Sequence, residues 1–331
     1  MTREDGWPVL PIKMRNDQVG GDTHSLTLLP NGQLYTVSHY GYETRLVPGC
    51  DDLDDEVSQQ LDMQYCSAMD VSSDGVIAVL GGDEIVVKEI LTGKVRKRWD
   101  AGSAVWGISL SADRKHLVVS REPNIFDLYL MVNYSLIHSV AEGERCAQVR
   151  FVNNEYDDIL LASSFQAGSV IYRTDPTIFP GPMPFGLDTS YDVIADLEVS
   201  PDKKWVAYSD AVMRIGELLE EPGRPPMKHV IHDPRGPSVN VQGMLNHSWS
   251  RPFWLSDTRL AASPPGGQKG LPSSGLNPET FIFDIPSGEI VAQLEVEKQV
   301  RDGFAMDRER SILYGSCMNG DILGWDVSSV L

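Results

Sequence analysis

The sequence has few cysteines, few basic residues and no long hydrophobic run, and each shortage excludes a class of protein. Four cysteines in 331 residues are too sparse for a disulfide framework, and no two have CxxC spacing. No stretch reaches the roughly 18 apolar residues that cross a membrane as a helix. The first six residues lack the apolar segment of a signal peptide. We therefore expect a reducing location, cytoplasmic or nuclear.

Basic residues are heavily outnumbered by acidic ones. Lys and Arg total 28 and Asp and Glu total 47, which gives a formal net charge of −19. Nucleic acids and anionic membranes both attract clustered cations, so we expect no direct nucleic-acid partner and no membrane partner. The one short basic run, residues 94–98, is expected to form a solvated strand face. The acidic run at 51–56 lacks the pattern of a calcium loop and is expected to be a solvated loop.

One frame recurs along the chain. It consists of a short apolar strand, a turn with Asp, Asn or Gly, a second and a third strand, a Gly turn and a fourth strand. Val, Ile and Leu fill the strands, and Gly, Asp and Ser fill the breaks, as strand and turn preferences require. The clearest copy has its strands at 66–71, 76–80, 85–90 and 94–99.

The first turn of this frame is found in six more copies. The copies follow one another at about 40 to 55 residues, which is typical of the four-stranded blades of a β-propeller. The six turns lie at 30–32, 111–114, 153–155, 200–203, 255–257 and 307–309.

Several copies resemble the WD-repeat family. Residues 321–327 are similar to that family's third strand with its Trp-Asp pair, here Trp325 and Asp326. The stretch 280–289 has the same form with Phe283 in place of Trp, and 200–202 reads as the family's first turn. The family's Gly-His dipeptide is missing, so the chain resembles a diverged member. The resemblance implies that Trp325 packs between blades with most of its area buried.

The predicted fold is all-β: a single seven-bladed β-propeller of four-stranded antiparallel blades that covers residues 1–331. The last copy ends after its third strand, and residues 7–14 supply an unassigned strand. Pairing of that strand with 322–327 closes the ring and removes an exposed sheet edge. Pro8 and Pro11 suit such an outer position. We expect residues 1–14 to form the closing strand of the last blade, and blades to begin near 24, 65, 103, 145, 191, 237 and 299.

Three long loops are expected on one face of the ring. The resemblance implies that loops from fourth to next first strands, and from second to third strands, share a face, which we call the top face. The loops are 179–186, 233–249 and 263–272. They carry apolar residues of the types enriched at binding hot spots, and simple tolerance of surface insertions is the open alternative. The candidate binding residues here are Phe179, Met183, Phe185 and Trp249.

A second candidate region is the mouth of the central channel. Four polar residues are expected near it: Gln148, Asp196, Arg251 and Asp302. They could bind a small molecule or hold channel water.

The sequence assigns no catalytic residue, metal site or cofactor. No phosphate loop, nucleophile elbow or dinucleotide fingerprint is present. His229 and His232 lie three apart in an expected strand, which places them on opposite faces. Cys66 and Cys146 start equivalent first strands and are expected to be core residues, because neither has a neighbouring base.

These observations favour a non-catalytic scaffold or adaptor that presents top-face loops to a protein partner of basic or mixed charge. The alternative is a propeller enzyme or a small-molecule binder that uses the channel mouth. Asp196, Asp302, Arg251 and Cys146 would then be the first candidates for its site.

Overall fold

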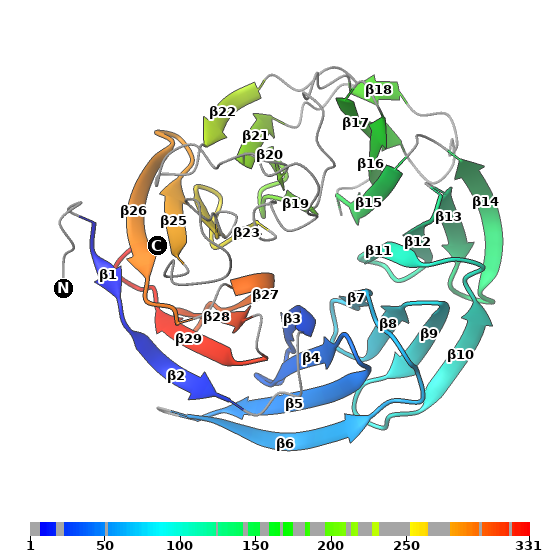
Figure 1. Ribbon diagram of the computed structural model, residues 1–331, viewed down its shortest axis with the longest axis horizontal. Helices are drawn as coiled ribbons and strands as arrows, with labels where there is room; N and C mark the ends of the chain where they lie inside the picture. The colour runs from blue at the N-terminus through cyan, green and yellow to red at the C-terminus, as the bar shows by residue number, and fades with distance from the viewer. Residues whose placement is uncertain are drawn as a thin grey trace, which may run out of the picture.

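Short strands joined by turns are arranged as sheets around a central axis in the computed structural model (Figure 1). The structure describes residues 7–17, 23–49, 52–123, 125–141, 145–152, 159–165, 168–174, 183–185, 196–209, 213–217, 227–231, 252–263, 279–297, 300–317 and 320–331. In five of the sheets the strands run in chain order from the axis outwards; in the other two, β23 and β27 are innermost and the N-terminal strands β1 and β2 are added on the outer side (Figure 1).

The strands of the first three sheets follow the repeat closely. They are β3 (Thr23–Leu28), β4 (Leu34–Ser38), β5 (Tyr42–Pro48) and β6 (Leu53–Gln60); β7 (Ala68–Val71), β8 (Ile77–Gly81), β9 (Glu84–Glu89) and β10 (Val95–Asp100); and β11 (Val105–Leu110), β12 (His116–Arg121), β13 (Ile125–Leu130) and β14 (Ser135–Ala141). The prediction that the acidic run 51–56 forms a loop is wrong from Leu53 onwards, because β6 begins there and pairs with β5. The basic run forms the exposed strand β10, as expected.

The next two sheets are β15 (Arg145–Phe151), β16 (Ile159–Phe165), β17 (Gly168–Thr174) and β18 (Met183–Phe185); and β19 (Asp196–Val199), β20 (Trp205–Ser209), β21 (Met213–Glu217) and β22 (Met227–Ile231). The chain then forms β23 (Phe253–Trp254), β24 (Arg259–Ala262), β25 (Thr280–Asp284) and β26 (Glu289–Leu294), followed by β27 (Val300–Asp307), β28 (Ile312–Cys317) and β29 (Ile322–Asp326).

The prediction of seven four-stranded antiparallel blades is wrong. Within the described residues, six sheets have four strands each, and the remaining sheet has five because β1 (Val9–Leu10) joins β26 in parallel. The N-terminal segment was expected to be one strand, but Pro11 has no N–H to donate to a ladder and the segment divides there. β2 (Ile12–Asn16) continues beyond the proline and pairs antiparallel with β29 in the neighbouring sheet.

The two N-terminal strands therefore join two sheets at once. β1 accepts bonds from the edge of β26: Gln293 N donates to Pro8 O at 3.0 Å, and Glu295 N donates to Leu10 O at 2.9 Å. β2 pairs Ile12 with Trp325 at one end and Asn16 with Ile322 at the other. We call this region, β1 and β2 with β26 and β29, the seam.

The first turns have one geometry in three copies, and it explains their sequence. The Ser72 hydroxyl donates to Asp74 at 2.7 Å and accepts from Ile77 N at 2.9 Å, which replaces ladder bonds that a turn cannot make. The same three-residue arrangement occurs at Ser111, Asp113 and His116, and at Ser200, Asp202 and Trp205. Despite partial burial, hydrogen bonds from Lys115 and Ser111 lower the pKa of Asp113 to about 2.

The core lies between neighbouring sheets. Ile85 and Val87 of one sheet pack against Leu117 and Val119 of the next, and similar clusters fill other junctions. Trp325 is fully buried at the seam, as predicted, and its indole N–H donates to Glu295 O at 2.8 Å. In the part of the chain that the structure describes, no helix is long and apolar enough to span a membrane.

Candidate functional site

The structure changes the setting of the residues predicted for the top face. Met183 and Phe185 do not lie in a blade-joining loop. They form β18, the outermost strand of its sheet, with Met183 opposite Arg173 and Phe185 opposite Ile171. The prediction of a loop over 179–186 is therefore wrong for Met183–Phe185. The Pro- and Gly-rich sequence around this short apolar strand is typical of loops and led to the wrong prediction. Phe179 and Trp249 lie outside the described residues.

The residues predicted for the channel mouth lie on innermost strands where they are described. Gln148 is in β15, Asp196 begins β19, and Asp302 is in β27 where the register shifts. Gln148 Oε1 lies 3.1 Å from the position that a Cβ would occupy on Gly107 of β11, so the glycine makes room for it. Arg251 lies outside the described residues, and convergence of the four side chains remains a prediction.

A different set of inner-strand side chains ties neighbouring sheets together. Asp70 Oδ2 on β7 accepts from Leu110 N at 2.7 Å, and Ser109 Oγ on β11 accepts from Phe151 N at 3.0 Å. Arg150 on β15 donates to Ile108 O at 3.1 Å and lies 3.4 Å from Glu198 Oε2 on β19. These polar groups therefore fix each sheet against the next.

The sequence carried a signal for these ties that our prediction missed. Asp70, Ser109, Arg150 and Glu198 are each the last residue but one of the first strand of their copy. A polar residue at the same position of four consecutive repeats indicates a repeated contact rather than a ligand site.

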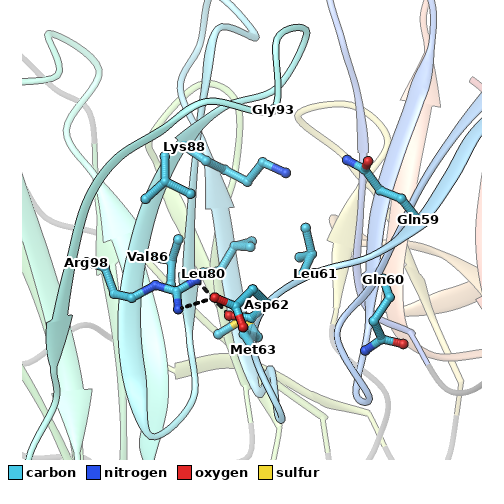
Figure 2. Close-up of a pocket in the computed structure, with 11 residues that line it drawn as sticks. Gln59, Gln60, Leu61, Asp62, Met63, Leu80, Val86, Lys88, Gly93 and Arg98 are labelled. Atoms are coloured by element: carbon cyan, nitrogen blue, oxygen red, sulfur yellow. Dashed lines mark hydrogen bonds and ion pairs between the residues drawn. The ribbon is translucent and has the colours of Figure 1, made fainter.

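A cleft of about 230 Å³ lies between the end of β6 and strands β9 and β10 (Figure 2). At its inner side Lys88 Nζ lies 2.5 Å from Glu43 Oε2, and Gln59 Nε2 donates to the same oxygen at 2.8 Å. Lys88 and Glu43 are 2% and 1% exposed. On the outer side Arg98 bonds to Asp62 at 3.0 Å. Ion pairs on both sides of the cleft thus connect the sheet β7–β10 to the sheet β3–β6 and to the segment that follows β6.

Two buried oxygens beside this ion pair, Tyr35 Oη and Glu43 Oε1, have no protein hydrogen-bond partner within the described residues. Burial, and then the charge of Glu43, raises the pKa of Tyr35 well above its usual value, so its hydroxyl stays protonated. The arrangement suits a stapled junction more than a site for chemistry, because the ammonium is already paired and almost fully covered. No group of three or more His, Cys, Asp or Glu residues that could hold a metal occurs within the described ranges.

An aromatic cluster lies on the top face, where our prediction named no residue. It consists of His39 and Tyr40 from the turn between β4 and β5 and Tyr65 from the segment between β6 and β7, and we include Tyr42, the first residue of β5, two positions after Tyr40. The rings of His39 and Tyr65 meet edge to face at 4.2 Å, and those of His39 and Tyr40 at 5.4 Å. Tyr40 is 62% exposed and Tyr42 is 40% exposed.

The backbone of this cluster is fixed by bonds to its surroundings. Cys66 N donates to His39 O at 3.0 Å, and Gln60 Nε2 donates to Tyr40 O at 2.9 Å. Gly41 has φ +75°, and a Cβ there would lie 2.6 Å from Met63 O, so only glycine fits the turn. The signal in the sequence was the run from His39 to Tyr42, three aromatic rings around a glycine.

The two described free cysteines behave as core residues. Cys66 is buried, as predicted, and its burial raises the pKa of its thiol to about 12. Cys317 is also buried, with its thiol pKa raised to about 12 by burial. Both are poor nucleophiles at neutral pH, because the thiolate is the reactive form.

Comparison with known proteins identifies the fold and leaves the family open. The structure is similar to the crystal structure described as the Myceliophteria thermophila Cps50 (Swd1) β-propeller domain, with a TM-score of 0.74 and 12% sequence identity over 95% of this chain and 100% of that one. No protein-family model and no curated protein matches the sequence. At this identity the likeness shows a β-propeller fold, and it carries no site from one chain to the other.

Proposed function

We propose that this protein is a non-catalytic interaction scaffold that binds a protein partner on its top face. The observation that carries the proposal is the exposed, rigid aromatic cluster of His39, Tyr40, Tyr42 and Tyr65. The likeness to a β-propeller domain of a WD-repeat protein supports it, since propellers of that kind commonly act by binding proteins.

Two physical properties make this cluster a suitable anchor. Tyrosine presents a large amphipathic area with few rotatable bonds, so little conformational entropy is lost when it is covered. The turn is already held by Gln60 and by the backbone of Cys66, so binding does not have to order it.

The partner is proposed to be a protein of basic or mixed charge, since the chain carries −19 and would attract such a surface. We propose a cytoplasmic or nuclear location, which the two buried reduced cysteines support. Phe179 and Trp249 are proposed to extend the contact area from their longer segments.

The test places a photo-crosslinking amino acid at Tyr40 and, as a matched control, at Leu91. Leu91 is 60% exposed, like Tyr40, but lies in the turn between β9 and β10, at the other end of its sheet. In extracts of the native source, we expect a discrete protein adduct from position 40 and none from position 91. Tyr40→Ala combined with Tyr42→Ala should lower recovery of that protein at least about tenfold, because hot-spot truncations cost ~2 kcal/mol or more. Adducts of equal yield at both positions, or unchanged recovery by a folded double variant, would refute the proposal.

A further inference from the structure

The five-stranded sheet shows that an outer edge of this ring accepts an added strand. β1 lies on the outer side of β26, where Gln293 N and Glu295 N donate to Pro8 O and Leu10 O. Leu10 is buried by this contact, and Trp7 packs edge to face on Phe281 at 5.9 Å. An extended apolar segment can therefore cover an edge with as few as two paired residues.

The outer strand β14 has the same local form as β26. In β26 the register shifts between the pairs Ile282–Ala292 and Phe283–Ile290, and the skipped residue is Val291. In β14 the shift falls between Leu128–His138 and Tyr129–Leu136, and the skipped residue is Ile137. Counted from these bulges, Gln293 and Glu295 of β26 correspond to Ser139 and Ala141 of β14. The N–H groups of Ser139 and Ala141 thus occupy the positions that bind β1 on β26.

No described strand covers this edge of β14, which ends its sheet (Figure 1). Ser139 and Ala141 are exposed, and next to them Leu136 and Ile137 are 51% and 39% exposed. An uncovered edge with exposed apolar side chains is a template for strand pairing.

Other outer strands carry residues that oppose such pairing. β10 contains two arginines and a lysine, β6 contains three carboxylates, β2 contains Lys13 and Arg15, and the short β18 contains a proline. β14, with the sequence Ser-Leu-Ile-His-Ser-Val-Ala, has no Lys, Arg, Asp, Glu or Pro. β22 contains Lys228, and β1 has only two residues. Charges and prolines are the usual protection of sheet edges, so among the described outer strands of more than two residues β14 is the one without either.

We propose that β14 is a second docking site, which takes an extended segment of a protein partner by strand addition. The β1–β26 contact sets its geometry: backbone carbonyls of the segment accept from Ser139 N and Ala141 N, and its apolar side chains cover Leu136 and Ile137. The net charge of −19 favours a segment flanked by lysine or arginine. The site is separate from the aromatic cluster and does not depend on the function proposed for that cluster.

The test uses a fluorescent peptide of alternating valine and threonine between paired lysines. The control peptide has the same side chains but N-methyl groups on alternate amides, which block strand pairing. We expect saturable binding of the first peptide alone, with slowed hydrogen exchange at β14 and unchanged exchange at the charged edge β10. Ser139→Pro removes one outward donor and should weaken binding about tenfold, the effect of losing a hydrogen bond worth ~1.4 kcal/mol.

A second pair of variants covers the case in which Ser139→Pro fails to fold. Leu136→Lys places a cation on the edge, and Val132→Lys places the same cation at a residue that is 82% exposed in the turn before β14. We expect Leu136→Lys to weaken binding of the lysine-flanked peptide and Val132→Lys to have a much smaller effect. Binding that is equal in both variants, or that protects no β14 amide, would overturn the proposal. Protection of β14 that rises with protein concentration without peptide would overturn it in favour of a second copy of this chain.

Discussion

Neighbouring sheets are joined differently in two regions, the seam and the junction between the sheets β3–β6 and β7–β10, which contains the buried Lys88–Glu43 pair and which we call the stapled junction. At the stapled junction the chain passes directly from β6 to β7, and the buried Lys88–Glu43 pair joins two sheets that are already covalently continuous. At the seam the paired residues are 284 positions apart between β1 and β26 and 306 to 313 apart between β2 and β29, and the contacts are backbone ladders from two short strands plus Trp325. The ring is therefore closed by noncovalent pairing of strands that lie far apart in the chain, so the seam should limit stability.

Removal of the N-terminal strands should have the largest effect. Without residues 1–16, β29 loses its outer neighbour and β26 loses β1, so two sheet edges become exposed together. We expect aggregation or a large fall in the thermal midpoint, measured by light scattering and circular dichroism. An unchanged thermal midpoint would contradict the expectation that the seam limits stability.

Trp325→Ala tests the side-chain part of the seam. The variant leaves a cavity in a cluster that includes Leu10 and Leu294 and loses the bond to Glu295 O, so we expect a loss of ~3–5 kcal/mol in the free energy of unfolding. Trp325→Phe keeps most of the apolar volume, so its free energy of unfolding should fall by less than that of the alanine variant. Loss of the hydrogen bond should account for about 1 kcal/mol of this fall. A loss below about 1 kcal/mol for the alanine variant would mean that Trp325 contributes little to closure.

The stapled junction is tested by breaking its ion pair. Glu43→Ala leaves the Lys88 charge buried without a partner and should cost ~3 kcal/mol in urea unfolding. Replacement of both residues, Glu43→Leu with Lys88→Met, should cost less than the single change, since no uncompensated charge remains. A double variant as unstable as the single one would show that the pair itself stabilises the junction.

Two cysteines report on the two regions separately, with the smallest expected effect. Cys66 packs in the cluster of the stapled junction, and Cys317 packs in the cluster of the seam. With both thiol pKa values raised to about 12, neither should react with iodoacetamide at pH 8 in buffer. As urea is added below the unfolding transition, Cys317 should be alkylated before Cys66, as mass spectrometry of the peptides would show. The opposite order would place the weaker contact at the stapled junction.

The same pKa shifts make stability depend on alkaline pH. The unfolded thiols ionise near pH 8.5, whereas the folded thiols hold their protons to about pH 12. Unfolding therefore releases protons between these values, and the stability contributed by Cys66 and Cys317 falls as pH rises above about 8.5.

The repeat made much of the fold predictable from sequence, because each strand and turn is encoded locally. The Ser-x-Asp turns and the buried Trp325 depend on residues within a few positions of each other or on the repeat frame. The division of the N-terminal strand was not predicted, because pairing of β1 with β26 depends on contacts far apart in sequence. The candidate sites were harder to predict than the fold. The aromatic cluster combines Tyr65 with residues more than twenty positions earlier, and β14 stands out only by comparison with the charges and prolines of other outer strands.

The most direct test of closure is hydrogen exchange of the amides in β2 in the intact protein. If β2 is a permanent part of its sheet, the amides that bond to β29 over Ile12–Asn16 should exchange as slowly as those within β29 itself. Exchange of these β2 amides at the rate of an unstructured peptide, with β28 and β29 still protected, would show that the N-terminal strand does not close the ring.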